Sequence, residues 1–276
     1  MNYRHAFHAG NFADCTKHAL LVWIVRAFRR KPAPFRVLDT HAGAGAYDLG
    51  SEEARHGGEW QAGIGRLLDV SKGPLADYAA LVREAGAPPA RYPGSPALLR
   101  ALLRPEDRLV CVELHPEEHA ALRSRFRADP QVSVHQRDAW EALRALTPFP
   151  ERRGLVLMDP PFEQPGEFER LSEGLALVAR RFRGAVQAAW YPVKHRAPIR
   201  AFNALVEAAG LRDVVAAELW LREPIDPSRL NGCGLLVVNP PWGFEAEARG
   251  ILAALLDRLG TGERGHGWAV TRIAEE

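Results

Sequence analysis

Two short stretches of the chain end an apolar run on a polar residue, two prolines and an aromatic ring: "DPPF" (159–162) and "NPPW" (239–242). A carboxylate and a nearby carbonyl oxygen can accept both hydrogens of an exocyclic amine, which frees its delocalised lone pair to attack an electrophile. Proline restricts the backbone and so orients the carbonyl, and an aromatic ring can stack on a base. The first stretch therefore predicts chemistry on an amino group, with Asp159 and the Pro160 carbonyl as acceptors and Phe162 as the stacking ring.

Glycine and further acids stand where other apolar runs end. "LDTHAGAG" (38–45) brings Gly43 to the end of the first run, where glycine lets the backbone approach a ligand closely. Glu113 ends the second run and can accept two ribose hydroxyls, and Asp138 ends the third and can accept an adenine amino group. Each acid can also be a simple helix cap, and the glycines a tight turn. With Asp159, three acids at consecutive strand ends favour a nucleoside site.

These residues need a parallel sheet to bring them together. Apolar, β-rich runs occupy 35–43, 108–116, 132–140, 154–162, 184–193, 214–221 and 233–242. Segments with helical spacing separate most of them, which predicts an α/β sheet of seven strands with helices on both faces. The last two runs are separated only by 222–232, too short for a crossover helix, so this final pair is predicted to be an antiparallel hairpin.

Chain direction separates the two Pro-Pro stretches. Asp159 leaves a parallel strand at the same edge as Gly43 and the other acids. The second stretch follows the reversed arm of the hairpin and is expected at the opposite edge, about 17 Å or more away. Asn239 is therefore expected to stop a strand and Trp242 to pack, without a part in the chemistry.

The segment 46–107 is longer than one helix requires between the first two strands. It predicts a helical subdomain inserted at about 48–92 into a single domain that spans 1–276. An N-terminal motif segment occupies about 1–20. It is rich in polar side chains, and either a metal site of His5, His8 and Asp14 or a helix capped by Asp14 explains it.

The composition is that of a globular protein without membrane spans. Of the 276 residues 47% are hydrophobic and 25% charged, the net charge is +2, and no apolar run approaches the roughly 20 residues of a membrane helix. Three scattered cysteines lack metal-ligand spacing, which indicates a reduced cytoplasm. Basic clusters at 26–36, 151–153, 179–183 and 194–200 are compatible with contacts to phosphates or with ordinary solvated surfaces.

The order of the motifs resembles one enzyme family. "YRHAFHAGNFADCTKH", "LDTHAGAG", "YPGSP", "ELHP", "DPPF" and "WYPV" follow one another as in the RlmJ-type 23S ribosomal RNA adenine-N6 methyltransferases, over essentially the whole chain. The resemblance implies a class I, Rossmann-like methyltransferase sheet, S-adenosyl-L-methionine as cofactor with S-adenosyl-L-homocysteine as product, and no metal. It also implies N6-methylation of a specific adenine in 23S rRNA, as free RNA or an early assembly particle, by a monomer in the cytoplasm.

The resemblance also implies roles for individual residues. The cofactor would be bound by His18, His41, Gly43, Ser95, Glu113, Asp138, Ala139 and Asp159. The catalytic residues would be Asp159, Pro160 and Phe162, and the RNA would meet Tyr3, Arg4 and Lys17. Ser95 also reads as an N-cap before Pro96. Two residues depart from the family pattern: Phe162 replaces a frequent Tyr, and Ala139 replaces a Gly. A contact through the main chain of residue 139 tolerates Ala if the φ of this residue is negative.

Other functions fit part of the pattern. An adenine-N6 DNA methyltransferase or a guanine-modifying rRNA methyltransferase shares the "DPPF" chemistry, and the amino-terminal motif favours the adenine rRNA enzyme. A nucleotide-binding oxidoreductase is disfavoured, because G-x-G-x-x-G is missing and the next strand-end acid lies 74 residues after Asp39 instead of roughly 20. A non-catalytic RNA-binding module leaves Asp159 and its prolines unexplained.

Overall fold

A single large sheet organises the protein. The computed structural model describes residues 5–86 and 90–276. Its eight-stranded sheet has the order β10-β8-β9-β7-β6-β1-β4-β5. The strands are β1 (Arg36–Asp39), β4 (Arg108–Glu113), β5 (Val132–Gln136), β6 (Gly154–Met158), β7 (Val186–Val193), β8 (Val214–Trp220), β9 (Gly232–Val238) and β10 (Gly267–Ala274). All seven expected strands are present.

The eighth strand, β10, corrects the predicted count of seven. It pairs antiparallel with β8 at the edge of the sheet and is mostly half-buried. An edge strand with one covered face lacks the continuous apolar run that marks the central strands, so its sequence carries a weak signal.

Strand directions confirm the expected reversal near the carboxyl terminus. β1, β4, β5, β6 and β7 are mutually parallel, whereas β9 is antiparallel to both of its neighbours, β7 and β8. Val238, the last residue of β9, pairs with Gln187 and Val214 near the beginnings of β7 and β8. The end of β9 therefore lies at the amino edge of the sheet, opposite the edge where β6 ends.

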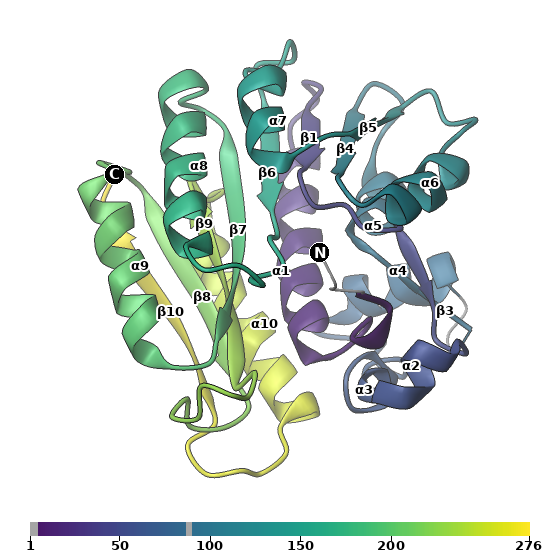
Figure 1. Ribbon diagram of the computed structural model, residues 1–276, viewed down its shortest axis with the longest axis vertical. Helices are drawn as coiled ribbons and strands as arrows, with labels where there is room; N and C mark the ends of the chain where they lie inside the picture. Colours follow the sequence, from purple (N-terminus) through teal and green to yellow (C-terminus); the bar gives the residue numbers. More distant parts are fainter. Residues whose placement is uncertain (1–4, 87–89) are drawn as a thin grey trace.

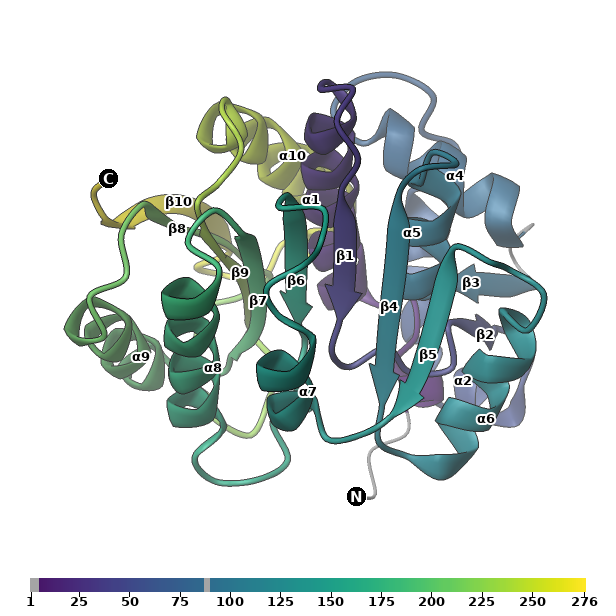
Figure 2. The ribbon, with the colours of Figure 1, turned by 90° about the horizontal axis from the view of Figure 1, so that it is seen from above.

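Helices cover both faces of the sheet (Figures 1 and 2). One face carries α1 (Phe12–Arg29), α5 (Ser95–Leu102), α6 (Pro116–Arg125) and α10 (Phe244–Leu259), and the other carries α7 (Ala139–Leu146), α8 (Glu167–Arg181) and α9 (Arg196–Ala208). Successive strand residues point to opposite faces, so Val37 packs in the first layer and Leu38 in the second. Both cores are built from alternate residues of the same strands.

The segment between β1 and β4 is largely helical. A small antiparallel pair, β2 (Ala46–Asp48) and β3 (Arg91–Pro93), brackets α2 (Glu52–Gly57), α3 (Glu59–Ala62), η2 (Ile64–Arg66) and α4 (Ala76–Gly86). A short helix, η1 (His5–Phe7), precedes α1 and lies against α2. Gly63 permits close packing here, because a Cβ at this position would lie 2.1 Å from the Gly10 carbonyl oxygen. The insertion thus contacts the amino-terminal segment.

Within residues 5–86 and 90–276, the structure contains no helix that is long and apolar enough to cross a membrane.

Candidate active site

The first turn of α1 places several polar side chains at the carboxyl edge of the sheet. Asn11 caps the helix, because its Oδ1 accepts hydrogen bonds from the main-chain N–H groups of Ala13 and Asp14, each at 3.0 Å. Asp14 lies inside the first turn and is not the cap that the sequence suggested. Its carboxylate is therefore available for other partners.

Asp14, Lys17 and Asp159 form a buried charged cluster. The Lys17 ammonium lies 3.0 Å from Asp14 Oδ1 and donates to Asp159 Oδ2 at 2.6 Å. Asp14 Oδ2 also accepts from His5 Nε2 at 2.8 Å and from the Gly10 main-chain N–H at 2.9 Å. The Lys17 and Asp14 side chains are only 6% and 2% exposed, and that of Asp159 is 16% exposed. A continuous set of charge contacts therefore runs from His5 to Asp159.

The electrostatics keep Lys17 and Asp14 charged. Burial by itself lowers the pKa of the Lys17 ammonium, but the Asp14 and Asp159 carboxylates outweigh it and raise that pKa above its usual value. Burial likewise raises the pKa of Asp14, yet His5 and Lys17 bring it well below its ordinary value. Lys17 was expected to meet RNA; the structure instead buries it as the counterion of Asp159.

Asp159 follows β6 directly and contacts the loop after β1. Its main-chain N–H donates to Nδ1 of His41 at 3.3 Å, and burial lowers the pKa of His41 to about 4. The neutral imidazole can accept this bond. The ring of His41 also packs edge-on against Trp140 of α7, with centroids 5.7 Å apart. These contacts fix the start of the "DPPF" turn against the loop after β1.

Phe162 closes this turn in an unusual backbone conformation. Its φ is +53°, in the left-handed region, which costs a non-glycine residue about 1–2 kcal/mol. The ring is half-buried and packs on Phe168 and Trp190, with centroids 4.8 and 5.9 Å away. Packing against Phe168 and Trp190 therefore holds the aromatic ring in place in spite of the backbone strain.

A second buried acid, Asp39, ends β1. It is fully buried, and its Oδ2 accepts a hydrogen bond from Ser95 Oγ at 2.7 Å, whereas Oδ1 has no partner among the described residues. Burial raises the pKa of Asp39 to about 7, although the Ser95 hydroxyl acts in the opposite direction. Ser95 is the first residue of α5 and Gly94 is its N-cap, so the expectation that Ser95 caps this helix was wrong.

The loop after β1 is tied to the end of β4. Gly43 has φ +57°, and a Cβ there would lie 2.1 Å from Tyr47 Oη, so this position requires glycine. The Gly43 N–H donates to Glu113 Oε2 at 2.8 Å, and the His115 N–H donates to Oε1 at 2.7 Å. Each carboxylate oxygen retains a further acceptor site. Glu113 is thus oriented at the sheet edge beside a close backbone approach.

Asp138 caps a helix, which is one of the two roles that the sequence allows for it. Its Oδ1 accepts from the main-chain N–H groups of Trp140 and Glu141 at 2.9 and 3.1 Å, as the N-cap of α7. A cap bond to one oxygen leaves the other free for a ligand. Ala139 is the first residue of this helix and is not among the residues with positive φ. The condition under which Ala can replace Gly is therefore met.

His18 supplies another unpartnered buried atom. Its Nδ1 shares a hydrogen bond with Tyr92 Oη at 2.7 Å, and Tyr92 Oη also lies 2.8 Å from Tyr78 Oη. Its Nε2 has no partner in the described part of the chain. Burial, followed by the Lys17 charge, lowers the pKa of His18 to about 3. The Nε2 of His18 and the Oδ1 of Asp39 are unsatisfied buried polar atoms of the kind that a bound polar ligand satisfies.

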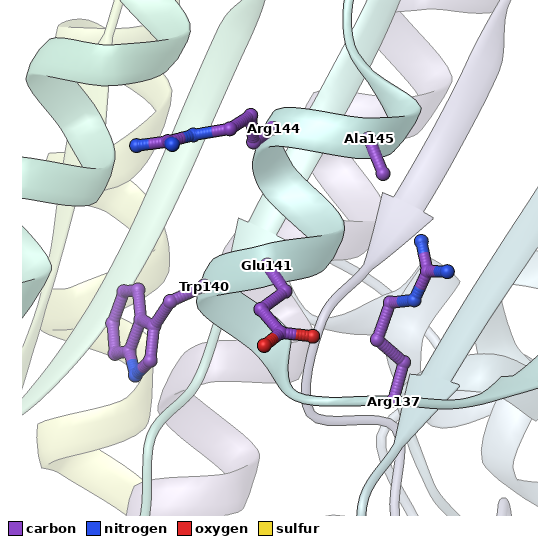
Figure 3. A pocket seen from close by; sticks show the side chains of 5 residues that line it. All are labelled: Arg137, Trp140, Glu141, Arg144 and Ala145. Carbon is purple, nitrogen blue, oxygen red and sulfur yellow. The ribbon is translucent and has the colours of Figure 1, made fainter.

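A separate hollow of about 530 Å³ opens beside α7. It is lined by Arg137, Trp140, Glu141, Arg144 and Ala145, and Figure 3 shows Trp140 and Arg137 on opposite sides of the helix. The lining carries both signs of charge and does not include Asp159. The charged cluster and the strand-end acids, not this hollow, make up the candidate active site.

The second Pro-Pro stretch lies at the other edge, as expected. The Asn239 side chain donates to the carbonyl oxygens of Arg183 and Ala185, both at 2.8 Å, and stops β9. Trp242 is 90% exposed, so the expectation that it packs was wrong. Phe244, two residues later, takes the buried position at the start of α10.

The sequence did not predict the Asp14–Lys17 pair or the parts that Asp39 and Glu59 play in the site. Asp14 and Lys17 are separated by one helical turn, a spacing that signals a side-chain pair. Asp39 stands before the glycine loop and was noted without a role. Glu59 of the insertion binds His8 and the Asn11 amide, both at 2.9 Å, and no local pattern indicates this.

Among the described residues, no group of three or more metal-binding side chains converges. Tyr3 and Arg4, expected at the RNA, lie outside the described residues.

The sheet has one reversed strand inside it and carries acids at the carboxyl ends of β4, β5 and β6. This arrangement defines a class I methyltransferase fold. A family model described as "RsmJ: Ribosomal RNA large subunit methyltransferase D, RlmJ" matches residues 32–272. The ribosomal RNA large subunit methyltransferases J of Escherichia coli and Haemophilus influenzae are 38% and 36% identical, over 98% and 100% of this chain and 99% and 100% of theirs. The chain belongs to this family of ribosomal RNA methyltransferases.

A solved structure has the same fold. The crystal structure of protein LPL1258 from Legionella pneumophila superposes with a TM-score of 0.87 at 30% identity, over 96% of this chain and 98% of that one.

Proposed function

We propose that this chain transfers a methyl group from S-adenosyl-L-methionine to N6 of a specific adenine in 23S ribosomal RNA. Its relatives are named as large-subunit rRNA methyltransferases. The observation that carries the proposal is the placement of Asp159, ion-paired and followed by Pro-Pro-Phe, at the sheet edge that also holds Gly43, Glu113 and Asp138.

The residues at this edge fit S-adenosyl-L-methionine. Glu113 would accept the ribose hydroxyls, and Asp138 with the main chain of Ala139 would bind the adenine of the cofactor. His18, His41 and Ser95, beside Asp39, would hold the methionine part, where the unsatisfied Nε2 and Oδ1 atoms offer hydrogen-bonding capacity. The acids also suit a cationic ligand. The cofactor supplies an electrophilic methyl group on a sulfonium.

Asp159 would prepare the adenine amine. Its carboxylate and the Pro160 carbonyl accept the two N6 hydrogens and so direct the nitrogen lone pair toward the methyl group. Lys17, bound to Oδ2, holds the carboxylate in place. Phe162 stacks on the base. No metal is required, because the electrophile is already activated.

The target adenine must leave its stack to reach Asp159. An unpaired or extruded base satisfies this. Tyr3 and Arg4 would contact the RNA. We further propose that the chain acts in the cytoplasm as a monomer of one domain with the 48–92 insertion, on free 23S rRNA or an early assembly particle.

Mass spectrometry of 23S rRNA tests the proposal. A strain that lacks the gene is complemented with wild type, Asp159→Ala or the control Asn239→Ala. One N6-methyladenosine should disappear in the deletion and return with wild type and the control, but not with Asp159→Ala. Unchanged modification in the deletion strain would refute the substrate. Binding of NAD by the purified protein without binding of S-adenosyl-L-methionine would instead favour an oxidoreductase.

A further inference from the structure

Three of the four basic clusters in the sequence meet at one edge of the sheet. The α1–β1 connection, the loop before β6 and the α8–β7 connection all precede parallel strands, so they lie together at the amino edge, toward the top of Figure 1. Asp159 follows β6 at the opposite edge. The clusters at 26–36, 151–153 and 179–183 therefore form part of one surface, remote from the candidate active site.

Hydrogen bonds between these loops make the surface continuous. The Arg153 guanidinium donates to the carbonyl oxygen of Phe28 at 3.0 Å and to that of Ala33. The Arg181 side chain donates to the carbonyl oxygen of Thr147 at 2.9 Å, which joins the end of α8 to the loop before β6.

The surface carries an excess of positive charge. Seven exposed cations of the three clusters form no ion pair with any described residue. Arg30 packs on Trp23 and Arg181 binds Thr147, whereas the side chains of the other five have no described contact of this kind: Arg29, Lys31, Arg152, Arg180 and Arg183. We call these five residues the amino-edge cluster. Acids in the connections at this edge are already paired with other arginines: Glu151 with Arg36, Asp107 with Arg104 and Asp213 with Arg272. The unpaired cations are thus free to bind an external anion.

An exposed aromatic ring borders the cluster. Asn239 binds the carbonyl oxygen of Arg183, and Trp242 stands three residues further along the same loop with 90% of its surface exposed. Guanidinium groups beside an exposed indole are the side chains that bind phosphates and stack on unpaired bases in nucleic acids.

We propose that the amino-edge cluster binds the phosphodiester backbone of 23S rRNA at a second site, distant from the target adenine. This inference rests on the proposed function. The five residues of β6 separate Arg153 from Asp159, and six steps of about 3.3 Å place the two surfaces about 20 Å apart. A short RNA around the target adenine reaches only the active site, whereas a domain-sized rRNA fragment reaches both.

The test compares two triple variants with the same change in net charge. The cluster variant replaces three of the five residues of the amino-edge cluster, by Arg29→Glu, Arg152→Glu and Arg183→Glu. The control variant replaces three exposed arginines elsewhere, by Arg123→Glu, Arg200→Glu and Arg264→Glu. Fluorescence anisotropy measures affinity for a domain-sized 23S rRNA fragment across a salt series. The cluster variant should lose at least about tenfold in affinity, and its salt slope should fall by about two, since each phosphate contact contributes about 0.7–0.9.

Methyl transfer to a short hairpin that carries the target adenine separates the two proposals. The cluster variant should methylate the hairpin at the wild-type rate, because the cluster is remote from Asp159. If wild type methylates neither RNA, the proposed function fails. If wild type methylates both and the cluster variant binds the long fragment like the control variant, the second site does not exist. A matching Arg→Gln set should show a smaller loss and serves if the glutamate variant does not fold.

Loss of binding to ribosomal particles, with unchanged binding to protein-free rRNA, would indicate a protein-docking surface and overturn the proposal.

Discussion

Replacing Lys17 by Met removes the ammonium that lies between two carboxylates while keeping an unbranched side chain of similar length. Lys17 contacts Asp14 at 3.0 Å and Asp159 at 2.6 Å, and neither the ammonium nor Asp14 is appreciably exposed. Solvent therefore screens these contacts far less than those of a surface pair. Removing one partner of a buried pair costs about 3–5 kcal/mol, because the remaining charge is left without compensation. We expect a loss of this size in the free energy of unfolding near pH 8.

The deficit of this variant should depend on pH. In the wild type the folded-state pKa of Asp14 lies below its unfolded value, so its contribution to stability is present above about pH 4 and is lost as the pH falls further. The raised pKa of Lys17 gives a contribution that is constant at neutral and acid pH and is lost only in strong base. Without Lys17 the buried carboxyl of Asp14 takes up a proton more readily. The difference between Lys17→Met and wild type should therefore shrink from pH 8 toward pH 5.

Urea unfolding followed by the fluorescence of the seven tryptophans measures these differences. Lys72→Met, which removes an exposed lysine, is the control and should change stability by less than about 0.5 kcal/mol. A loss for Lys17→Met as small as that of the control, or one independent of pH, would show that the buried ion pairs contribute little and refute the reasoning.

Three further predictions follow from single contacts. Asn239→Ala should cost about 2–3 kcal/mol of stability, because residue 239 has a φ of +52° and two hydrogen bonds are lost. This variant should keep the wild-type rate of methyl transfer per folded molecule, whereas Asp159→Ala should abolish methyl transfer. Gly43→Ala should weaken S-adenosyl-L-homocysteine binding at least tenfold, measured by calorimetry, because its Cβ meets Tyr47 Oη. In urea unfolding, the stability of Asp39→Asn relative to wild type should rise from pH 4 to pH 7, by up to about 4 kcal/mol.

The sign of the Asp39 effect follows from its raised pKa of about 7. The protonated Asp39 side chain contributes its full stability to wild type below the unfolded-state pKa of 3.8, and this contribution is lost as the pH rises through 7. Asn cannot ionise, so the variant does not lose stability in this range. A stability difference that does not change with pH would show that Asp39 ionises normally. For Gly43→Ala the control is Gly184→Ala, which meets open space, and equal binding by both variants would contradict the close approach. If Asn239→Ala lost turnover as Asp159→Ala does, the assignment of the working motif would be wrong.

Local patterns predicted much of the sheet and its edge. The central strands are continuous apolar runs, and the short segment 222–232 indicated the reversal before β9. Because parallel strands end at one edge, the positions of Glu113, Asp138 and Asp159 there followed from the order of the elements alone. The half-exposed β10 escaped notice for the opposite reason, since its pattern resembles that of a loop.

The burial of charged and aromatic side chains was less predictable. The family resemblance predicts that Lys17 meets the RNA, and lysine is rarely buried. Lys17 is nevertheless buried, because Asp159, 142 residues away, supplies a carboxylate 2.6 Å from its ammonium. Trp242 and Phe244 are both aromatic residues after the same strand, and the sequence does not tell which one the start of α10 turns inward.

By itself the sequence determined the class of fold, the "DPPF" motif and the edge at which it emerges, because strand type and direction depend on residues close together in the chain. Only the tertiary structure decided that Asp14 and Lys17 hold Asp159, that Asp39 is a buried acid bound to Ser95, and that three basic clusters form one surface. Those features depend on distances between segments far apart in the sequence, and the packing of α1 and α5 against the sheet sets these distances.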